Sequence, residues 1–220
     1  MSIPGNRIHP APACAPDAIV TGLRDVVVPH LSDNLARSVG IGGLTRYNRT
    51  GKLVGTAFTV KCRPGDNLMI YKALTMMSAG HVLVVDGAGH LDNALVGELI
   101  KLYALQRGCV GFVIDGAIRD VACFTDFPCY ARGVNHKGPY KDGPGEINVP
   151  VSIGGQVVMP GDIVVGDEDG VVCFPQASAE HLLTLADAHR RKEDAIQQEI
   201  ASGVPDQAWI TKILTAKGLI

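Results

Sequence analysis

The chain has 220 residues, enough for one sizeable domain with its own core. Its formal net charge is −2, which gives no electrostatic reason to expect nucleic acid or a membrane surface as a partner. Hydrophobic residues make up 46% of the chain, as in a well-packed globular protein. No apolar run reaches the roughly 18 residues that span a bilayer, and residues 1–20 lack the pattern of a signal peptide. These features predict one cytoplasmic domain over 1–220, with a flexible arm at 1–15 and a C-terminal helical segment at 176–220.

The six cysteines form no CxxC pair, so we expect reduced thiols rather than disulfides. Cys62, Cys109 and Cys173 lie in apolar runs and are predicted to be small core residues. Cys123 and Cys129 are the alternatives for a catalytic thiol, although no motif recommends either.

The first third of the chain predicts short helices around one strand. The expected elements are a helix at 16–24, a helix from about 32 to 39, a strand at 53–62 and a helix at 67–78. Pro16 suits the start of the first helix, and Ser32-Asp33 resembles a cap for the second. Gly80 is placed to end the last one.

Residues 82–120 have the pattern of a strand–helix–strand unit. Apolar runs at 82–85 and 110–114 predict two buried strands. The helix between them carries an apolar stripe that we expect to cover a sheet, formed by Leu95, Leu99, Leu102 and Leu105 with Val96 and Tyr103. In such units, ligands bind at the loops after the strands and at the helix start.

The last hundred residues predict mixed structure. The expected elements are a helical turn at 121–126, a small strand around Tyr130, a loop at 136–150, antiparallel strands at 151–174 and a long helix at about 176–201. The middle of that helix is charged, which is typical of a solvated helix, but a C-terminal helix can also reach a neighbouring subunit.

Three charged residues of the central unit are the main candidates for chemistry. Arg119 and Asp120 follow the second strand, and Glu98 falls near the helix start. Arginine offers a planar charged fork for a carboxylate or enolate oxygen, and aspartate can bind a hard divalent cation. The amides of Leu99 and Ile100, in the first helical turn, could hold a substrate carboxylate. The alternatives are a structural turn at Arg119-Asp120 and a Glu98 that only complements the helix dipole.

Other motifs are weaker. The stretch 86–89 (Asp-Gly-Ala-Gly) lacks the GxGxxG spacing of dinucleotide sites, and 167–169 favours a hairpin turn over a calcium loop. His81, His90 and His136 have no HxH or HExxH partner, so these histidines predict no zinc site.

The central motifs resemble those of the RraA-like family. The resemblance rests on residues 96–100 (Val-Gly-Glu-Leu-Ile) and 114–120 (Ile-Asp-Gly-Ala-Ile-Arg-Asp), where Glu98 and Arg119-Asp120 keep the family spacing of an acidic residue, twenty residues and Arg-Asp. Further similar stretches are Asp66-Asn67, Pro160-Gly161-Asp162 and 169–172. The family includes class II pyruvate aldolases acting on 4-hydroxy-4-methyl-2-oxoglutarate and 4-carboxy-4-hydroxy-2-oxoadipate.

The resemblance implies an α/β fold of the swivelling-domain type, with a compact β-barrel or β-sandwich core flanked by helices. It also implies trimers or hexamers with active sites between subunits. The implied function is divalent-metal-dependent aldol cleavage of 4-hydroxy-2-keto diacids to pyruvate, with oxaloacetate decarboxylation as a side activity.

The resemblance also implies roles for single residues. Asp120 would anchor Mg²⁺ or Mn²⁺, and Arg119 would contact the pyruvoyl keto oxygen. The substrate carboxylate would be bound by Gly97, Glu98, Leu99 and Ile100. Glu98 would also hold a water that carries a proton.

The chain departs from the family pattern in two places. Many members have Asp where this chain has Glu98. Aldolases of the family also use a Glu from the neighbouring subunit's C-terminal region, for which Glu193 is the candidate metal ligand and Glu199 the runner-up. The ending at 206–220 matches no aldolase ending.

Two other functions are attached to the family. RraA itself inhibits an RNA-degrading endonuclease by protein contact, so the alternative function is a protein-binding regulator of a ribonuclease without catalytic activity. A demethylmenaquinone methyltransferase label is also in use, but the sequence has no glycine loop of the S-adenosylmethionine type.

Overall fold

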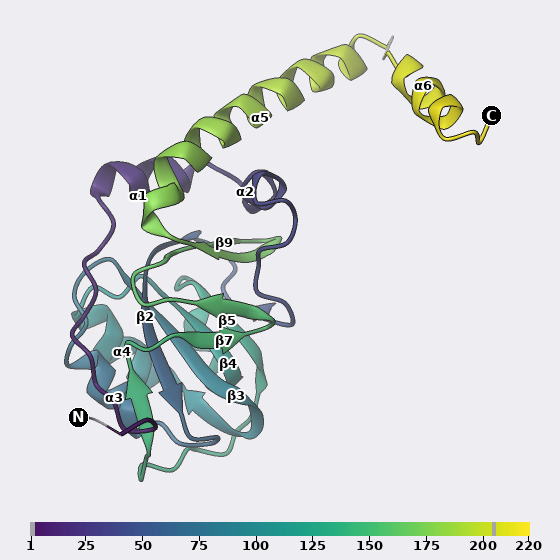
Figure 1. Cartoon of the computed structure of the whole chain (residues 1–220). Coiled ribbons are helices and arrows are strands. Elements are labelled where there is room, and N and C mark those ends of the chain that lie inside the picture. The colour runs from purple at the N-terminus through teal and green to yellow at the C-terminus, as the bar shows by residue number, and fades with distance from the viewer. Residues whose placement is uncertain (1–2, 204–205) are drawn as a thin grey trace.

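The computed structural model describes residues 3–203 and 206–220 as a mixed α/β fold around a central sheet (Figure 1). The sheet has eight strands in the order β1-β5-β4-β3-β2-β9-β10, with β6 paired to β2, and β7 and β8 form a separate hairpin. The strands are β1 (Thr45–Arg46), β2 (Leu53–Cys62), β3 (His81–Val96), β4 (Gly111–Ile118), β5 (Cys129–Val134), β6 (Gly145–Ile147), β7 (Val151–Ile153), β8 (Gln156–Val158), β9 (Ile163–Asp167) and β10 (Gly170–Phe174).

The middle of the sheet is parallel. Strands β2, β3, β4 and β5 pair in parallel, and β4 is buried along its whole length. Apolar runs such as 82–85 form these strands because a parallel sheet covered on both faces needs hydrophobic residues on both sides. The predicted strand–helix–strand unit is therefore present. The predicted antiparallel strands at 151–174 are confirmed, with β9 pairing to both β10 and β2.

The sheet is strongly curved, because the segment 41–46 contacts strands near both edges of the sheet. Ile41 forms a bridge with Val171 of β10, and Thr45 pairs with Ala131 of β5. Between these ends lies an apolar core that includes Val84, Val113 and Tyr130. Among the described strands, continuous pairing does not close a barrel.

Six α-helices and two 3₁₀ turns are described around the sheet. They are α1 (Asp17–Arg24), α2 (Val28–Asn34), α3 (Leu68–Leu74), α4 (Glu98–Gln106), α5 (Ala179–Ala201), α6 (Ala208–Ala216), η1 (Val121–Phe124) and η2 (Gln176–Ser178). Helix α1 and the turn η1 agree with the sequence-based prediction. Helix α3 ends four residues earlier than predicted, and β6 lies inside the segment predicted to be a loop.

The helix predicted from about 32 to 39 was wrong. Helix α2 begins at Val28, with Pro29 in its first turn, where proline is favoured. It ends at Asn34 because Ala36 and Arg37 have φ of 58° and 55°, and these left-handed values do not continue an α-helix.

The predicted apolar stripe on the central helix was also wrong. Leu95 belongs to β3, and the helix buries Ile100 and Ala104 instead. Leu99, Leu102, Tyr103 and Leu105 are all exposed, by 46–61%. Helix α4 therefore leaves an apolar face uncovered within one chain.

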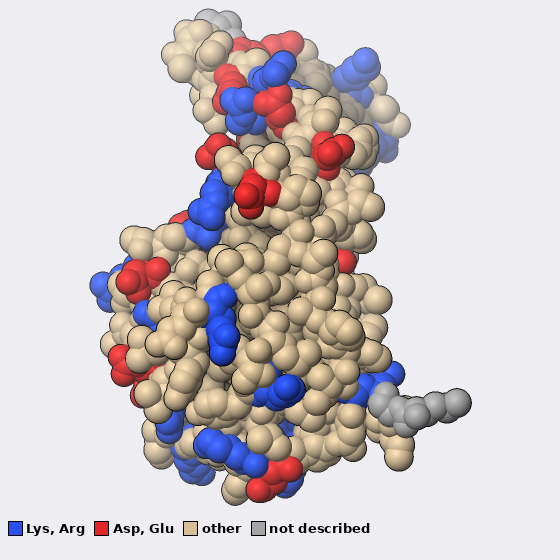
Figure 2. Space-filling view, turned by 90° about the vertical axis from the view of Figure 1, so that its left-hand side faces the viewer, with Lys and Arg blue, Asp and Glu red and all other residues tan. Residues whose placement is uncertain are grey.

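The C-terminal helices leave the body of the fold (Figure 1). Helix α5 packs on α2 through its first half, and its last buried residue is Ala186. No described residue of α6 is buried. Figure 2 shows side chains of both signs on this projecting part, and Lys and Arg side chains spread between uncharged areas on the body below it. None of the helices in 3–203 and 206–220 is both long and apolar enough to span a bilayer.

The described part of the N-terminal arm follows the surface of the sheet. Ile8 forms a parallel bridge with Ile147 of β6, and Arg7 pairs with Glu146. The side chain of His81 contacts the carbonyl of Pro12 at 3.1 Å. The flexibility of residues 1–15 stays a prediction.

One buried carboxylate fixes the loop at 139–143. Asp66 is 2% exposed, and its side chain accepts N–H groups of Leu68, Asp142 and Gly143 at 2.9, 2.6 and 3.0 Å. The loop is thereby held against the start of α3.

Replacing Asp66 by Asn should release this loop. The amide would place N–H donors against the N–H groups of Asp142 and Gly143, so we expect the free energy of unfolding to fall by roughly 2–4 kcal/mol. Urea denaturation measures this change. Asp142→Asn, an exposed carboxylate of the same loop, is the control and should stay within about 0.5 kcal/mol of the wild type. Equal stability of the two variants would contradict this role of Asp66.

Candidate active site

The ends of β3 and β4 bring the predicted charged residues together. Val96 and Ile118 are partners in the parallel pairing of these strands, and the amide of Arg119 donates to the carbonyl of Val96 at 3.0 Å. The residues that follow each strand, Gly97 on one side and Arg119-Asp120 on the other, therefore lie side by side.

Gly97 is where these two segments touch. A Cβ added at this position would lie 2.5 Å from Asp120 Oδ2 and 2.9 Å from Arg119 Cγ. The backbone of Gly97 is extended, with φ of −156°, so space rather than conformation demands glycine.

Asp120 has one carboxylate oxygen engaged and one free. Its Oδ2 accepts the amide of Glu98 at 3.1 Å and lies 3.6 Å from Arg119 Nε. Its Oδ1 accepts no hydrogen bond from the described residues, and 47% of its side chain is exposed. Asp120 has φ of 54°, a left-handed conformation that aspartate tolerates better than most residues. Such backbone strain is common at functional sites.

The start of α4 supplies free backbone donors. The first helical hydrogen bond runs from the amide of Lys101 to the carbonyl of Gly97 at 3.1 Å. The amide of Glu98 is taken by Asp120, while those of Leu99 and Ile100 have no acceptor among the described residues. These two donors and the helix dipole favour an anion at this position.

The opposite wall comes from α3 and from the loop that Asp66 holds. The hollow has a volume of about 40 Å³, room for a few waters, and its walls include Asn67, Tyr71, Pro139 and Lys141. Asn67 Nδ2 donates to the carbonyl of Leu95 at 2.9 Å, while its buried Oδ1 has no hydrogen-bond partner within residues 3–203 and 206–220. Lys141 Nζ lies 5.9 Å from the centroid of the Tyr71 ring and adds positive charge.

Most of the predicted site residues line this hollow. Gly97, Leu99, Ile100, Arg119 and Asp120 all do. The backbone of Glu98 contacts Asp120, but its side chain is exposed and is not part of the wall, so its catalytic role stays a prediction.

The sequence prediction missed three wall residues. It treated Asn67 only as the first residue of a predicted helix and as part of a family-like stretch, and it gave Tyr71 and Lys141 no role in the site. Pro139 and Gly143 of the loop at 139–143 indicated only that the chain turns there.

Glu193, the predicted metal ligand, lies elsewhere within its own chain. It is on α5, and the hollow beside it shares no wall residue with the hollow at Arg119. Its carboxylate contacts His30 and His189, and the hydrogen bond with His30 lowers the pKa of Glu193. A role of Glu193 in a neighbouring subunit's site stays a prediction.

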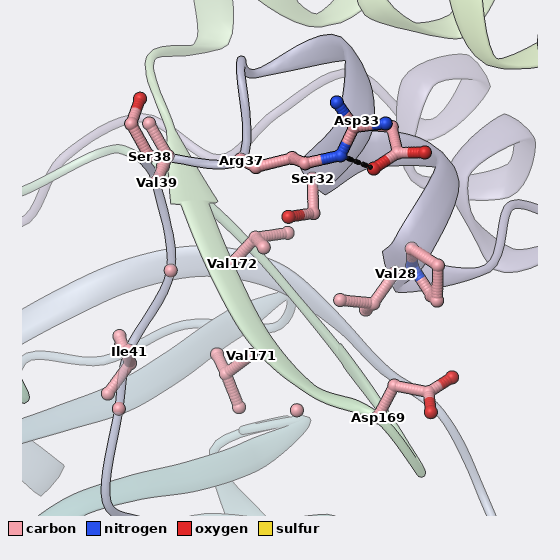
Figure 3. A pocket seen from close by; sticks show the side chains of 14 residues that line it. Val28, Ser32, Asp33, Arg37, Ser38, Val39, Ile41, Asp169, Val171 and Val172 are labelled. Atoms are coloured by element: carbon pink, nitrogen blue, oxygen red, sulfur yellow. Dashed lines mark ion pairs between the residues drawn. The ribbon is translucent and has the colours of Figure 1, made fainter. Parts of the chain in front are cut away.

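A larger hollow lies between α2 and β10 (Figure 3), with a volume of about 570 Å³. Its walls combine aliphatic side chains with Ser32, Ser38 and Asp169. The remaining two charged groups, Arg37 and Asp33, pair with each other at 2.7 Å. It does not combine a free cation, free amides and an available carboxylate, so size alone does not make it the better candidate.

The thiols do not compete for the catalytic role. Burial raises the pKa of Cys62 to about 12 and that of Cys109 to about 11, as expected for core residues. Burial also raises the pKa of Cys123 and Cys129, a shift away from the thiolate that a nucleophilic cysteine needs.

The family model described as RraA-like, Aldolase/RraA, matches residues 28–173. The chain belongs to the RraA-like family. A relative from Halalkalibacterium halodurans is 36% identical over 202 residues, covering 89% of this chain and 95% of its own length. Its name, 4-hydroxy-4-methyl-2-oxoglutarate aldolase, is provisional.

Solved structures of RraA-like proteins share the fold. An uncharacterized protein from Pseudomonas syringae superposes with a TM-score of 0.75 at 26% identity, covering 89% of this chain and 96% of that one. Streptomyces coelicolor RraAS2, titled an unusual member of the RNase ES inhibitor RraA protein family, gives 0.76 at 25% identity, covering 84% and 99%. RraA from Thermus thermophilis, titled an RNA-processing inhibitor, gives 0.63 at 30% identity, covering 69% and 93%.

Gly97→Ala should disturb the site directly. The new methyl group would force Asp120 and the Arg119 side chain apart, which we expect to cost about 1–3 kcal/mol of the free energy of unfolding. Urea denaturation gives this value, and a crystal structure gives the displacement. Gly42→Ala is the control, because its Cβ would meet one atom at 3.4 Å, an ordinary contact. An unshifted Asp120 in the Gly97 variant would contradict the close approach.

Proposed function

We propose that this RraA-like protein is a divalent-metal-dependent pyruvate aldolase that cleaves 4-hydroxy-2-keto diacids. The observation that carries the proposal is the convergence of Arg119, Asp120 and the free amides of Leu99 and Ile100 on one hollow. A guanidinium, an available carboxylate and an anion-binding helix start are the groups that a 2-keto acid and a hard cation require. The provisional aldolase name of the 36% identical relative supports the same reaction.

The residues present fit a magnesium-class ion. Asp120 Oδ1 is free to bind, and Mg²⁺ is commonly held by one or two carboxylates with several waters completing its shell. Asp120 would therefore hold Mg²⁺ or Mn²⁺ largely through waters, and Asn67 Oδ1 is a nearby acceptor without a protein partner. When bound, the ion supplies Lewis-acid polarisation of the keto group.

The protein's own groups position the pyruvoyl part of the substrate. Its carboxylate accepts the amides of Leu99 and Ile100 at the start of α4, and the helix dipole favours its charge. Its keto oxygen faces the guanidinium of Arg119. The second carboxylate of the diacid lies toward the ammonium group of Lys141, in the wall formed by the loop at 139–143.

Bond cleavage then follows the flow of one electron pair. A base removes the proton of the C4 hydroxyl, the C4–O electrons form a carbonyl, and the C3–C4 bond breaks. The bond's electron pair delocalises into the pyruvate enolate, whose oxygen Arg119 stabilises as its charge develops. Protonation at C3 yields pyruvate. Loss of CO₂ from oxaloacetate passes through the same enolate and is the expected side activity.

The proton passes through a water. We assign this water to the carboxylate of Glu98, which projects from the helix start beside Asp120, and a carboxylate from a neighbouring chain's C-terminal region completes the set. The uncovered apolar face of α4 and the projecting helices α5 and α6 support an assembly of several chains.

A second candidate function comes from the structural neighbours. One of them is titled a member of the RNase ES inhibitor RraA protein family and another an RNA-processing inhibitor, so a ribonuclease regulator without catalysis is the alternative. It predicts binding to a ribonuclease that does not depend on Mg²⁺ and survives loss of Arg119.

Arg119→Lys should abolish most of the activity. Lysine keeps the charge but lacks the planar fork, so we expect kcat for pyruvate release to fall by roughly 10²–10³, as for the loss of an oxyanion-stabilising donor. Pyruvate is measured over a panel of 4-hydroxy-2-keto diacids and oxaloacetate, with Mg²⁺ and with EDTA.

Arg24→Lys is the control for this experiment. Arg24 is exposed in the last turn of α1, and its substitution should leave kcat unchanged. A protein that releases no pyruvate from any member of the panel, or one whose Arg119→Lys variant is fully active, would refute the aldolase proposal. Activity that persists in EDTA would refute its metal dependence.

A further inference from the structure

A second group of potential metal ligands lies between α2 and α5. His30 Nε2, His189 Nε2 and the carboxylate of Glu193 offer three ligand atoms that all lie within 4.8 Å of one another. One oxygen of Glu193 is 2.8 Å from His30 and the other is 3.3 Å from His189. Both Nε2 atoms therefore contact the same carboxylate, and the two imidazole rings stack with centroids 4.8 Å apart.

The fold holds these three side chains in place. Helices α2 and α5 pack through a shared apolar cluster that includes Leu31, Leu182 and Ala186. His30 is 9% exposed beside this cluster, while His189 and Glu193 stand one turn apart on the same face of α5. The two elements therefore present the ligands from rigid backbones.

A further carboxylate lies beside the group. Asp33 Oδ2 is 3.8 Å from His189 Nε2, and Arg37 fixes the other oxygen of Asp33 at 2.7 Å (Figure 3). Side chains of α2 (His30 and Asp33) and of α5 (His189 and Glu193) therefore lie around one point.

We propose that His30, His189 and Glu193 bind a divalent transition-metal ion of the zinc class. Two imidazoles and one carboxylate are a nitrogen-rich set that suits Zn²⁺, whereas Mg²⁺ prefers oxygen ligands alone. Neighbouring ligands on a tetrahedral zinc lie roughly 3.3 Å apart. The His189–Glu193 pair already has this separation, and the His30–Glu193 pair would open by about half an ångström. The widest separation, which is at most 4.8 Å, would close by up to about 1.5 Å. Asp33 or a water takes the fourth position.

The position of the site gives the ion a structural role. Beyond Ala186, α5 buries no residue, and in that exposed stretch Glu193 contacts His30 of α2 and His189 contacts Asp33 of α2. The ion therefore holds the part of α5 beyond Ala186 against α2. It thereby fixes the direction of the C-terminal arm, which is the rest of α5 together with α6. This site is separate from the one at Asp120, because the two hollows share no wall residue.

A metal ion bound by Glu193 also affects which C-terminal glutamate can reach a neighbouring chain. Glu193 is engaged by His30 and His189 of its own chain, and Glu199 accepts the amide of Asp206, so each carboxylate already has a contact within one chain. The proposed clamp does not depend on aldolase activity.

The test is a titration of the full-length, chelator-treated protein with Co²⁺ alone, followed by visible absorption. We expect saturable ligand-field bands at one Co²⁺ per chain and their loss on adding Zn²⁺. His189→Gln and Glu193→Gln should each weaken Co²⁺ binding at this site by at least roughly tenfold, with unchanged circular dichroism. Both side chains are partly exposed, so neither substitution removes core packing.

Two control variants complete the experiment. His181→Gln, on the same helix and exposed, should keep the bands, and so should Asp120→Asn. Wild-type protein without bands, or bands that persist in both the His189 and Glu193 variants, would overturn the proposal and leave a simple hydrogen-bonded cluster. Bands lost only in Asp120→Asn would also overturn it, because they would place the ion at the proposed aldolase site.

Discussion

The candidate site depends on one close approach, that of Gly97 to the Arg119-Asp120 pair. Strands β3 and β4 end in register at Val96 and Ile118, so the segments that follow them must pass each other closely. Only a residue without a side chain fits between them, since a Cβ would lie 2.5 Å from the Asp120 carboxylate. This contact lets one carboxylate oxygen cap the start of α4 while the other stays free, and it sets the guanidinium beside the free amides.

The same region is open toward solvent. The hollow of about 40 Å³ is small for a diacid, and the neighbouring face of α4 exposes Leu99, Leu102 and Tyr103. In our proposal the outer wall comes from another chain, and the C-terminal arm is the segment suited to supply it. The metal clamp at His30, His189 and Glu193 would then control how this arm leaves the body. Catalysis and arm geometry would thus depend on two different ions, a hard one at Asp120 and a softer one between α2 and α5.

The central features of the site could be predicted from sequence for a simple reason. Apolar runs ending in polar residues identify parallel strands, and the carboxyl ends of such strands share one edge of a sheet. Arg119, Asp120 and the start of α4 therefore had to converge. The side-chain position of Glu98 could not be predicted, because the direction of a side chain at a helix start depends on the residue at which the helix begins.

Contacts between distant segments escaped prediction. His30 and Glu193 are 163 residues apart and meet only because α2 and α5 pack on the same face of the sheet. The uncovered stripe on α4 followed the expected periodicity, yet periodicity does not say whether the covering surface belongs to the same chain. The early end of α2 depends on the left-handed φ of Ala36 and Arg37, which their identities do not signal.

The most direct test of the central claim is thermal unfolding with oxalate, a planar dianion that resembles the pyruvate enolate. Our account predicts that oxalate with Mg²⁺ raises the Tm of the wild type, by an amount equivalent to about 2.7 kcal/mol at a hundred times its Kd, and that Asp120→Asn abolishes the rise. No rise in the wild type, or an equal rise in Asp120→Asn, would contradict it.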